Sequence, residues 1–154
     1  MNAKRRDFWN VLAGAAVLAC STVAALVAVD VQAQTAQNAA AKNKLVIQVS
    51  DADPKKWGLA LNNARNVQQD LGRDLVEIEI VAYGPGIGML KIDSEVGTRV
   101  SEAIGDGVKL VACENTMANQ KLTRDDLLPR IGYAKSGVVE IIQKQQQGYA
   151  YIRP

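Results

Sequence analysis

The sequence predicts an α/β fold, a three-layer α/β/α sandwich whose mostly parallel sheet of about five strands has helices on both faces. Two observations predict it. Short β-branched runs alternate along the chain with segments whose apolar residues recur at helical spacing. One run, at 108–112, is almost wholly apolar, which is typical of a strand buried on both faces. The composition agrees, since 48% of the 154 residues are hydrophobic and 22% are charged, as in ordinary globular proteins.

A strand and a long helix open the domain. Residues 44–50 form a β-branched run that indicates a strand. Asp53 can accept hydrogen bonds from the free amides of a first helical turn, and Pro54 suits the first helical position. Apolar residues then recur at helical spacing from Trp57 to Leu71, so this helix is expected to bury one face.

A second strand and a second helix follow. Residues 75–83 alternate between apolar residues and glutamates and end apolar, which indicates a strand. The glycine-rich stretch 84–88 is interpreted as a tight connection, because it has neither the spacing of a dinucleotide-binding loop nor the Lys-Ser/Thr of a phosphate loop. The next helix is expected to begin near Asp93 or Ser94 and to end at Gly105.

The last third of the chain contains shorter elements. They are expected, in order, as a strand at 108–112, a helical turn at 116–120, a capping box at 123–126, a strand at 131–134, a helix at 138–147 and a strand at 149–152.

The first 33 residues have the pattern of an export signal. A basic cluster at Lys4 to Arg6 precedes an uncharged run at 11–29, and short residues flank a cleavage position after Ala33. The arginine pair resembles a twin-arginine signal, although Lys4 stands where Ser or Thr is usual. We expect cleavage after Ala33 and a periplasmic location. Two alternatives stay open: the run at 11–29 could remain as a membrane anchor, or Cys20 could be lipidated.

Domain organisation follows from this leader. Residues 1–33 are the export signal, 34–43 are predicted to be a flexible tether of Ala, Gln and Asn, and 44–154 form the folded domain. After cleavage Cys113 would be the single cysteine, which excludes an intrachain disulfide.

Composition excludes several classes of function. The chain has no His, so it has no Ser-His-Asp triad, no His general base and no imidazole-ligated metal. Two cysteines cannot build a Cys-only zinc site, and we expect neither a metal nor another cofactor. The net charge of +2 and the absence of a basic stripe argue against a nucleic-acid partner. A membrane partner is expected only through an uncleaved or lipidated leader.

Ligands of parallel sheets bind beyond the carboxyl ends of the strands, and three loops of this chain qualify. The central one contains Cys113, which we take as the candidate catalytic residue. The candidate pocket residues from the three loops are Ser50, Asp51, Tyr83, Gly84, Pro85, Gly86, Asn115 and Thr116.

Cys113 itself has two interpretations. A lone cysteine is often a small buried hydrophobe. A helical turn that opens at Asn115 or Thr116 would instead favour its thiolate, whereas the neighbouring Glu114 would raise the thiol pKa. Asp51, together with Asp53, could act as an acid and base or bind a cation, but Asp53 is more simply a helix cap.

Six segments, in this order and spacing, resemble the DsrE/DsrF-like sulfur-relay family. They are Leu45–Asp51, Ala60–Ala64 with Asp70–Gly72, Val81–Gly86, Ala112–Met117, Gly137–Ile141 and Gly148–Ile152. The resemblance covers residues 44–154. It implies a small α/β/α domain that assembles into homo-oligomers. By motif position it also implies that Cys113 accepts sulfane sulfur as a persulfide and passes it on, with thiol proteins as donor and acceptor.

Three hypotheses for function remain. In the first, Cys113 is an accessible thiolate that carries sulfur. In the second, the protein is a non-catalytic, oligomeric ligand-binding or assembly protein in which Cys113 is buried packing. In the third, Cys113 is a redox sensor that links two subunits on oxidation. The sequence leaves open whether the protein is an enzyme.

Overall fold

The structure is a computed structural model that describes residues 43–154. The predictions made for the leader and most of the tether, namely cleavage after Ala33, the membrane anchor and lipidation of Cys20, lie outside the described residues. No helix within 43–154 is both long enough and apolar enough to span a bilayer.

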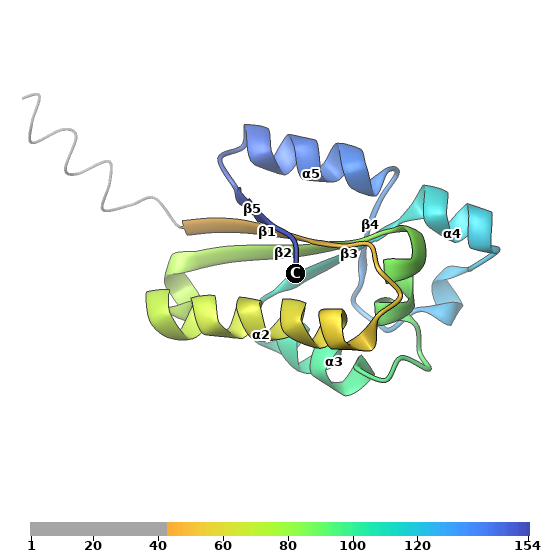
Figure 1. Ribbon diagram of the computed structural model, residues 1–154, viewed down its shortest axis with the longest axis horizontal. Helices are drawn as coiled ribbons and strands as arrows, with labels where there is room; N and C mark the ends of the chain where they lie inside the picture. The colour runs from red at the N-terminus through yellow and green to blue at the C-terminus, as the bar shows by residue number, and fades with distance from the viewer. Residues whose placement is uncertain (1–42) are drawn as a thin grey trace, which may run out of the picture. The chain divides into compact units, whose positions relative to one another are not determined.

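The sheet has five strands, all parallel, in the order β4-β3-β2-β1-β5 (Figure 1). They are β1 (Asn43–Val49), β2 (Val76–Ala82), β3 (Lys109–Cys113), β4 (Gly132–Ala134) and β5 (Ala150–Ile152). Val49 lies opposite Ala82, and Ala82 lies opposite Ala112. The carboxyl ends of the three central strands therefore meet at one edge of the sheet, as the sequence predicts.

Helices cover both faces, which confirms the three-layer α/β fold. The helices are α2 (Pro54–Leu71), α3 (Gly97–Gly105), α4 (Glu114–Gln120) and α5 (Gly137–Gln146), with short 3₁₀ helices η1 (Arg73–Leu75), η2 (Gly84–Leu90) and η3 (Arg124–Asp126). Figure 1 shows α2 and α3 on one face of the sheet, α5 on the other, and α4 beyond the carboxyl end of β3. One face is thus covered by two helices and the other by a single helix.

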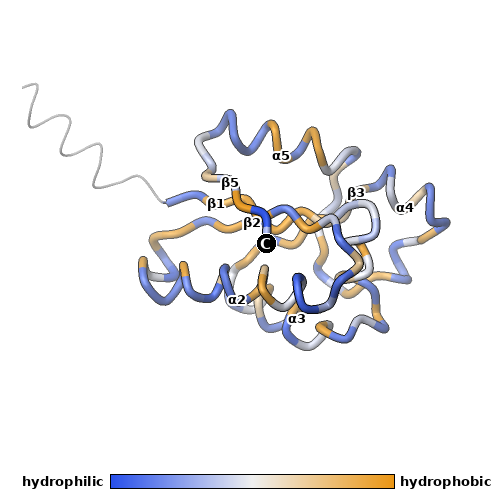
Figure 2. Tube along the Cα trace, in the orientation of Figure 1, coloured by the Kyte–Doolittle hydropathy of each residue, from blue (hydrophilic) through white to orange (hydrophobic). Residues whose placement is uncertain are grey.

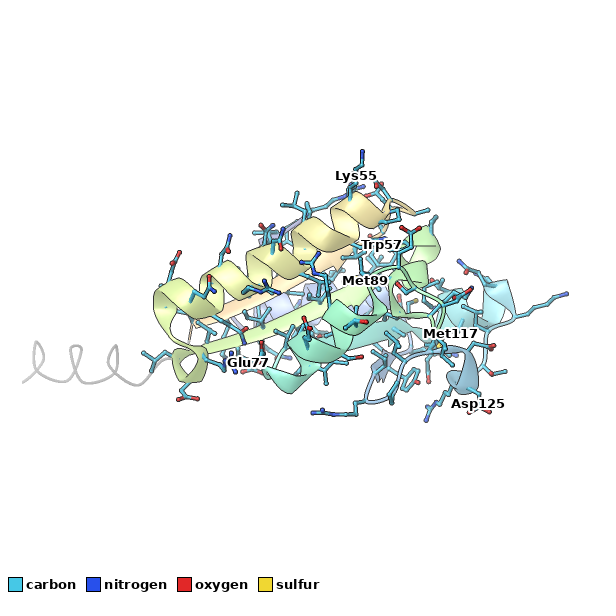
Figure 3. All side chains as sticks on the ribbon, turned by 90° about the horizontal axis from the view of Figure 1, so that it is seen from below. Lys55, Trp57, Glu77, Met89, Met117 and Asp125 are labelled. Carbon is cyan, nitrogen blue, oxygen red and sulfur yellow. The ribbon has the colours of Figure 1, made fainter. Side chains whose placement is uncertain are left out.

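Local chemistry explains the start of α2. The Asp53 carboxylate accepts a hydrogen bond from the Lys55 amide at 2.9 Å, and Pro54 occupies the first helical position, as predicted. Trp57 is 7% exposed and its indole N–H donates to the Asp51 carbonyl at 2.7 Å. Trp57 and Met89, both labelled in Figure 3, belong to the same apolar core.

The two faces of the sheet bury cores of different size. The larger core lies between the sheet and α2 and α3. The smaller core, on the α5 face, comprises Val46, Val81, Val111, Ile141 and Tyr149. Figure 2 shows the strands as largely hydrophobic and much of the helix surface as hydrophilic, as burial of the sheet requires.

One predicted boundary is wrong by a few residues. Helix α3 begins at Gly97 rather than near Asp93 or Ser94. Residues 91–94 are held in turns instead, and Lys91 forms an antiparallel bridge with Leu127. A tertiary contact therefore outweighs the local helical preference. The predicted tight connection at 84–88 is the 3₁₀ helix η2, which continues to Leu90, and the capping box at 123–126 is present.

Candidate functional site

Cys113 is the last residue of β3 and the N-cap of α4, so strand and helix together place its sulfur at the carboxyl edge of the sheet. Its side chain is nevertheless buried, with 5% of the residue exposed. Of the two interpretations of Cys113, the single chain shows the buried one; the accessible thiolate of the first hypothesis is not seen in it. The reason is close packing at the start of α5: a Cβ atom at position 137 would lie 3.3 Å from the Cβ of Cys113 and 3.0 Å from that of Tyr83.

Hydrogen bonds oppose the effect of burial on this thiol. Burial raises the pKa of Cys113, but the nearby Thr116 hydroxyl and the backbone amides of Gly137, Thr116 and Asn115 lower it by more. The pKa of Cys113 consequently lies below its ordinary value. The Asn115 amide also donates to the Lys135 carbonyl at 3.2 Å. Two of the amides come from the first turn of α4, and the third is the first amide of α5. Glu114, which the sequence analysis expects to raise the thiol pKa, is not among the groups that shift it; its carboxylate lies 3.5 Å from Arg124, and the net shift of the pKa is downward.

Thr116 links Cys113 to the glycine-rich segment. The Thr116 side chain is buried, and its Oγ1 accepts a hydrogen bond from the Gly84 amide at 2.9 Å. Because that donor occupies one side of the oxygen, the hydroxyl proton is free to point to the sulfur. Gln120 donates to the Gly84 carbonyl at 3.1 Å, so α4 holds Gly84 from both sides. Gly84 has φ +54°, a left-handed conformation that favours glycine.

The other residues of the glycine-rich segment form the support of the site. Gly86 is buried against β1, where a Cβ atom would lie 2.3 Å from the Val49 carbonyl oxygen. The Tyr83 amide donates to the same carbonyl at 3.1 Å, and Tyr83 is half-buried. Pro85 occupies the first turn of η2 and is exposed.

The predicted residues after β1 are engaged elsewhere. Ser50 accepts a hydrogen bond from Gln48 at 3.1 Å. Asp51 forms ion pairs with Lys56 at 3.1 Å and with Arg153 at 3.3 Å, and the hydrogen bond that it accepts from Lys56 lowers its pKa. These contacts tie the loop to α2 and to the carboxyl-terminal segment. The structure thus places Asn115 and Thr116 beside Cys113 and joins Gly84 to Thr116 by a hydrogen bond. Ser50 and Asp51 have other partners.

Two cavities formed by the described residues, of about 470 and 380 Å³, have linings that do not include Cys113. One of about 470 Å³ is lined by residues that include Arg73, Glu77, Asp106 and Lys109, at the amino-terminal ends of β2 and β3. Figure 3 shows Glu77 and Met117, the latter in α4, towards opposite ends of the sheet. Within the same residues no group of three Cys, Asp or Glu side chains is placed to hold a metal ion.

The sequence of the described domain decides the family. A model of the DsrE/DsrF-like family matches residues 43–154. The chain belongs to the DsrE/DsrF-like family. Membership confirms the resemblance drawn from the six segments. No curated protein sequence matches the chain.

Solved structures of DsrE-like proteins agree with this assignment. A protein of unknown function from Methanobacterium thermoautotrophicum is 39% identical, with a TM-score of 0.70, over 73% of this chain and 100% of that one. A conserved protein of unknown function from Bacteroides thetaiotaomicron is 17% identical, with a TM-score of 0.60, over 73% of this chain and 95% of that one. The second likeness concerns the fold alone. Both neighbours are of unknown function, so the chemistry of this DsrE/DsrF-like chain has to be argued from its own residues.

Sequence reasoning missed one residue beside Cys113 and one buried ion pair elsewhere on the sheet. The first is Gly137, whose amide reaches Cys113 from 24 positions further along the chain. The second is the buried ion pair between Glu79 of β2 and Lys144 of α5, whose charged atoms lie 2.7 Å apart. A signal for the pair was present: a charged residue in the middle of a strand that is covered on both faces requires a partner.

Proposed function

We propose that this DsrE/DsrF-like protein is a sulfur carrier, related in chemistry to the sulfurtransferases, in which Cys113 holds sulfane sulfur as a persulfide. The observation that carries the proposal is the placement of a buried sulfur at the start of α4, beside the Thr116 hydroxyl and the amides of Thr116 and Gly137, where its pKa is lowered in spite of burial. Only the thiolate is nucleophilic, and donors that stabilise it also stabilise the persulfide anion formed from it. A cysteine used only as packing has no need of such donors.

The proposed transfer balances without an external oxidant. The Cys113 thiolate attacks the terminal sulfane sulfur of a polysulfide, a new S–S bond forms, and the donor's S–S bond breaks. The donor leaves with the bonding electron pair as a polysulfide anion one sulfur shorter. An acceptor thiolate then attacks the outer sulfur of the persulfide, and Cys113 leaves as the thiolate.

Low exposure fits this chemistry in one respect. The 5% exposure of Cys113 limits contact with peroxide and other oxidants, which convert accessible thiolates to sulfenic and sulfinic acids. We further propose that the carrier is periplasmic, on the evidence of the leader pattern in residues 1–33, and that it works as a homo-oligomer between thiol proteins that donate and accept sulfur.

Polysulfide loading tests the proposal. The reduced full-length protein is treated with sodium polysulfide, and the peptide that contains Cys113 is examined by mass spectrometry, which separates it from the peptide of Cys20. We expect the Cys113 peptide to gain the mass of one sulfur and to lose it when an acceptor thiol is added. The Cys113→Ser variant is the control. A Cys113 peptide that stays unmodified while free cysteine is loaded would refute the proposal.

A second function, a non-catalytic ligand-binding or assembly protein, is favoured by two observations. Cys113 is almost fully buried, and three apolar residues of α5, Val138, Val139 and Ile142, are each about half exposed. Alkylation of the native protein separates the alternatives. A structural cysteine reacts with iodoacetamide only after denaturation, whereas a carrier thiolate reacts in the folded state. A non-reducing gel after peroxide treatment tests the third hypothesis, a Cys113 link between subunits.

A further inference from the structure

The face of the sheet under α5 is apolar at one end and charged at the other. The residues of β2 that alternate onto this face are Glu77, Glu79, Val81 and Tyr83. Lys44 of β1 lies opposite Glu77, and Lys109 of β3 lies opposite Glu79. Charged side chains of three neighbouring strands therefore share the face that α5 alone covers (Figure 1).

Glu79 is buried in this charged half with unequal partners for its two oxygens. The residue is 2% exposed. Its Oε2 lies 2.7 Å from the Nζ of Lys144 of α5, whereas its Oε1 is buried without a hydrogen-bond partner among the described residues. A carboxylate that is out of reach of water needs donors on both oxygens, so Oε1 is the costly atom of this pair. A proton on Oε1 removes the buried negative charge.

One ammonium group serves two acids here. Glu140, one helical turn before Lys144, places its carboxylate 3.6 Å from the same Nζ. Its side chain is 23% exposed against 3% for that of Glu79, so Glu140 keeps contact with water and Glu79 does not. Two carboxylates and one ammonium group carry a net charge of −1 in this nearly closed site. Burial raises the pKa of Glu79, the hydrogen bond from Lys144 lowers it by less, and the charge of Glu140 adds to the rise.

The other charged groups around Glu79 have partners of their own. Lys109 of β3 lies 2.8 Å from Glu77 of β2. The Nζ of Lys44 of β1 lies 5.6 Å from the centre of the Tyr149 ring, and burial raises the pKa of the Tyr149 hydroxyl above its ordinary value, so that group stays neutral. In the part of the chain that the structure describes, the lysine of α5 is thus the one cation within ion-pairing distance of Glu79.

We propose that Glu79 is a pH-sensitive latch for the second half of α5, which closes on the sheet while Glu79 holds a proton and loosens when that proton is lost. In the closed state the proton is on Oε1, Oε2 accepts the hydrogen bond of Lys144, and Lys144 stays paired with Glu140. When the helix lifts, Glu79 meets water, where its pKa has the ordinary value of 4.5, and the proton leaves to solvent. Opening releases one proton, so a rise in pH favours the open state.

Packing confines this loosening to the second half of the helix. The start of α5 is tied down, because Cys113 of β3 pairs with Ala134 of β4 and the Asn115 amide donates to the Lys135 carbonyl at 3.2 Å. The core under α5 has only five buried residues, against 23 in the larger core on the other face. A segment that buries so little can open without unfolding of the rest of the domain.

Hydrogen exchange measured by mass spectrometry tests the latch. Exchange of the full-length protein is followed from about pH 5 to pH 8, corrected for the chemical exchange rate, in peptides of α5 and of α2. We expect protection of α5 to fall by up to about tenfold per pH unit, the slope for release of one proton, while that of α2 stays constant. Glu79→Gln, a neutral side chain of the same shape, should keep α5 protected throughout. Protection of α5 that stays constant or rises with pH, or that Glu79→Gln lowers at pH 8, would overturn the proposal.

Glu77→Gln is the matched control. Glu77 lies two residues before Glu79 on the same face of β2, and the hydrogen bond from Lys109 lowers its pKa to about 2, so it stays ionised from pH 5 to pH 8. This variant should leave the pH dependence of α5 unchanged. If it abolishes that dependence as Glu79→Gln does, the effect belongs to the charge of the whole face and the latch is wrong. Cys113→Ser, which removes the titration of the thiol beside α5, should keep the slope of the unmodified protein.

A direct measurement does not depend on whether a variant folds. The carbon-13 chemical shift of the Glu79 carboxyl in the labelled, unmodified protein reports its protonation, with Glu77 as the reference for an ionised glutamate. We expect Glu79 to remain protonated above pH 4.5, where Glu77 is already ionised, and to titrate at higher pH. A Glu79 carboxyl that titrates at or below pH 4.5 would show that the ion pair keeps it ionised, which contradicts the latch. Neither result bears on polysulfide loading of Cys113, so the latch and the proposed function fail independently.

Discussion

Replacement of Gly86 by alanine tests how the glycine-rich segment supports the site. A Cβ atom at this position would lie 2.3 Å from the Val49 carbonyl oxygen, 2.6 Å from its carbon and 2.8 Å from the Ser50 nitrogen. All three are backbone atoms at the end of β1, so no side chain can rotate away. Relief requires η2 and β1 to separate by roughly 1 Å, and overpacking of this kind costs about 1–3 kcal/mol. We take the upper end, since Val49 is 4% exposed.

Thermal unfolding followed by circular dichroism measures this cost. A loss of about 3 kcal/mol lowers Tm by roughly 10–15 °C in a domain of this size. Gly105→Ala is the matched control, because no atom lies within 4 Å of the Cβ position of this last residue of α3. We expect that variant to be unchanged or slightly stabilised, by up to about 1 kcal/mol. Equal Tm values for Gly86→Ala and the unmodified protein would refute the reasoning, as would an equal loss in both variants.

Three further predictions concern charges and contacts around the sheet edge. Thr116→Val removes the hydroxyl beside Cys113 and leaves the half-buried Gly84 amide unpaired. We expect a raised thiol pKa in the pH profile of alkylation and a loss of about 1 kcal/mol in urea unfolding, while Thr116→Ser retains both properties. Gly137→Ala brings a methyl group 3.0 Å from the Cβ of Tyr83 and should also raise the thiol pKa; an unchanged alkylation profile would contradict the stated packing. The hydrogen bond from Lys109 lowers the pKa of Glu77 from 4.5 to about 2, so its stabilisation is present above pH 4.5 and is lost as the pH falls towards 2. The difference in urea midpoint between the protein and Glu77→Gln should therefore shrink over that range, and a constant difference would count against the ion pair.

Several elements could be predicted because their signals are local. The β-branched run of β1, the cap at Asp53 and the apolar stripe that begins at Trp57 each depend on residues within a few positions of one another. The fold class followed from the order of these elements, and the structure and the family comparison confirm it. The start of α3 could not be predicted in the same way, because the bridge between Lys91 and Leu127 joins segments 36 positions apart.

Glu79 shows where local sequence patterns no longer predict burial. Its alternation with apolar neighbours in β2 reads as a half-exposed strand, yet it is 2% exposed because α5, more than 50 residues later, covers it and supplies Lys144. The exposure of Cys113 cannot be decided from the sequence for the same reason: Gly137, which packs against Tyr83 and Cys113, lies 24 positions further along the chain.

The sequence by itself determined the alternation of strands and helices, the edge of the sheet to which Cys113 belongs, and the family. Hydrogen bonding and side-chain shape within a few residues decide the strands and helices, and the order and spacing of six segments indicate the family. Only the tertiary structure decided how buried the sulfur is, which amides reach it and which lysine compensates Glu79. Those properties depend on distances between segments far apart in the chain, which are set when α5 packs on the sheet.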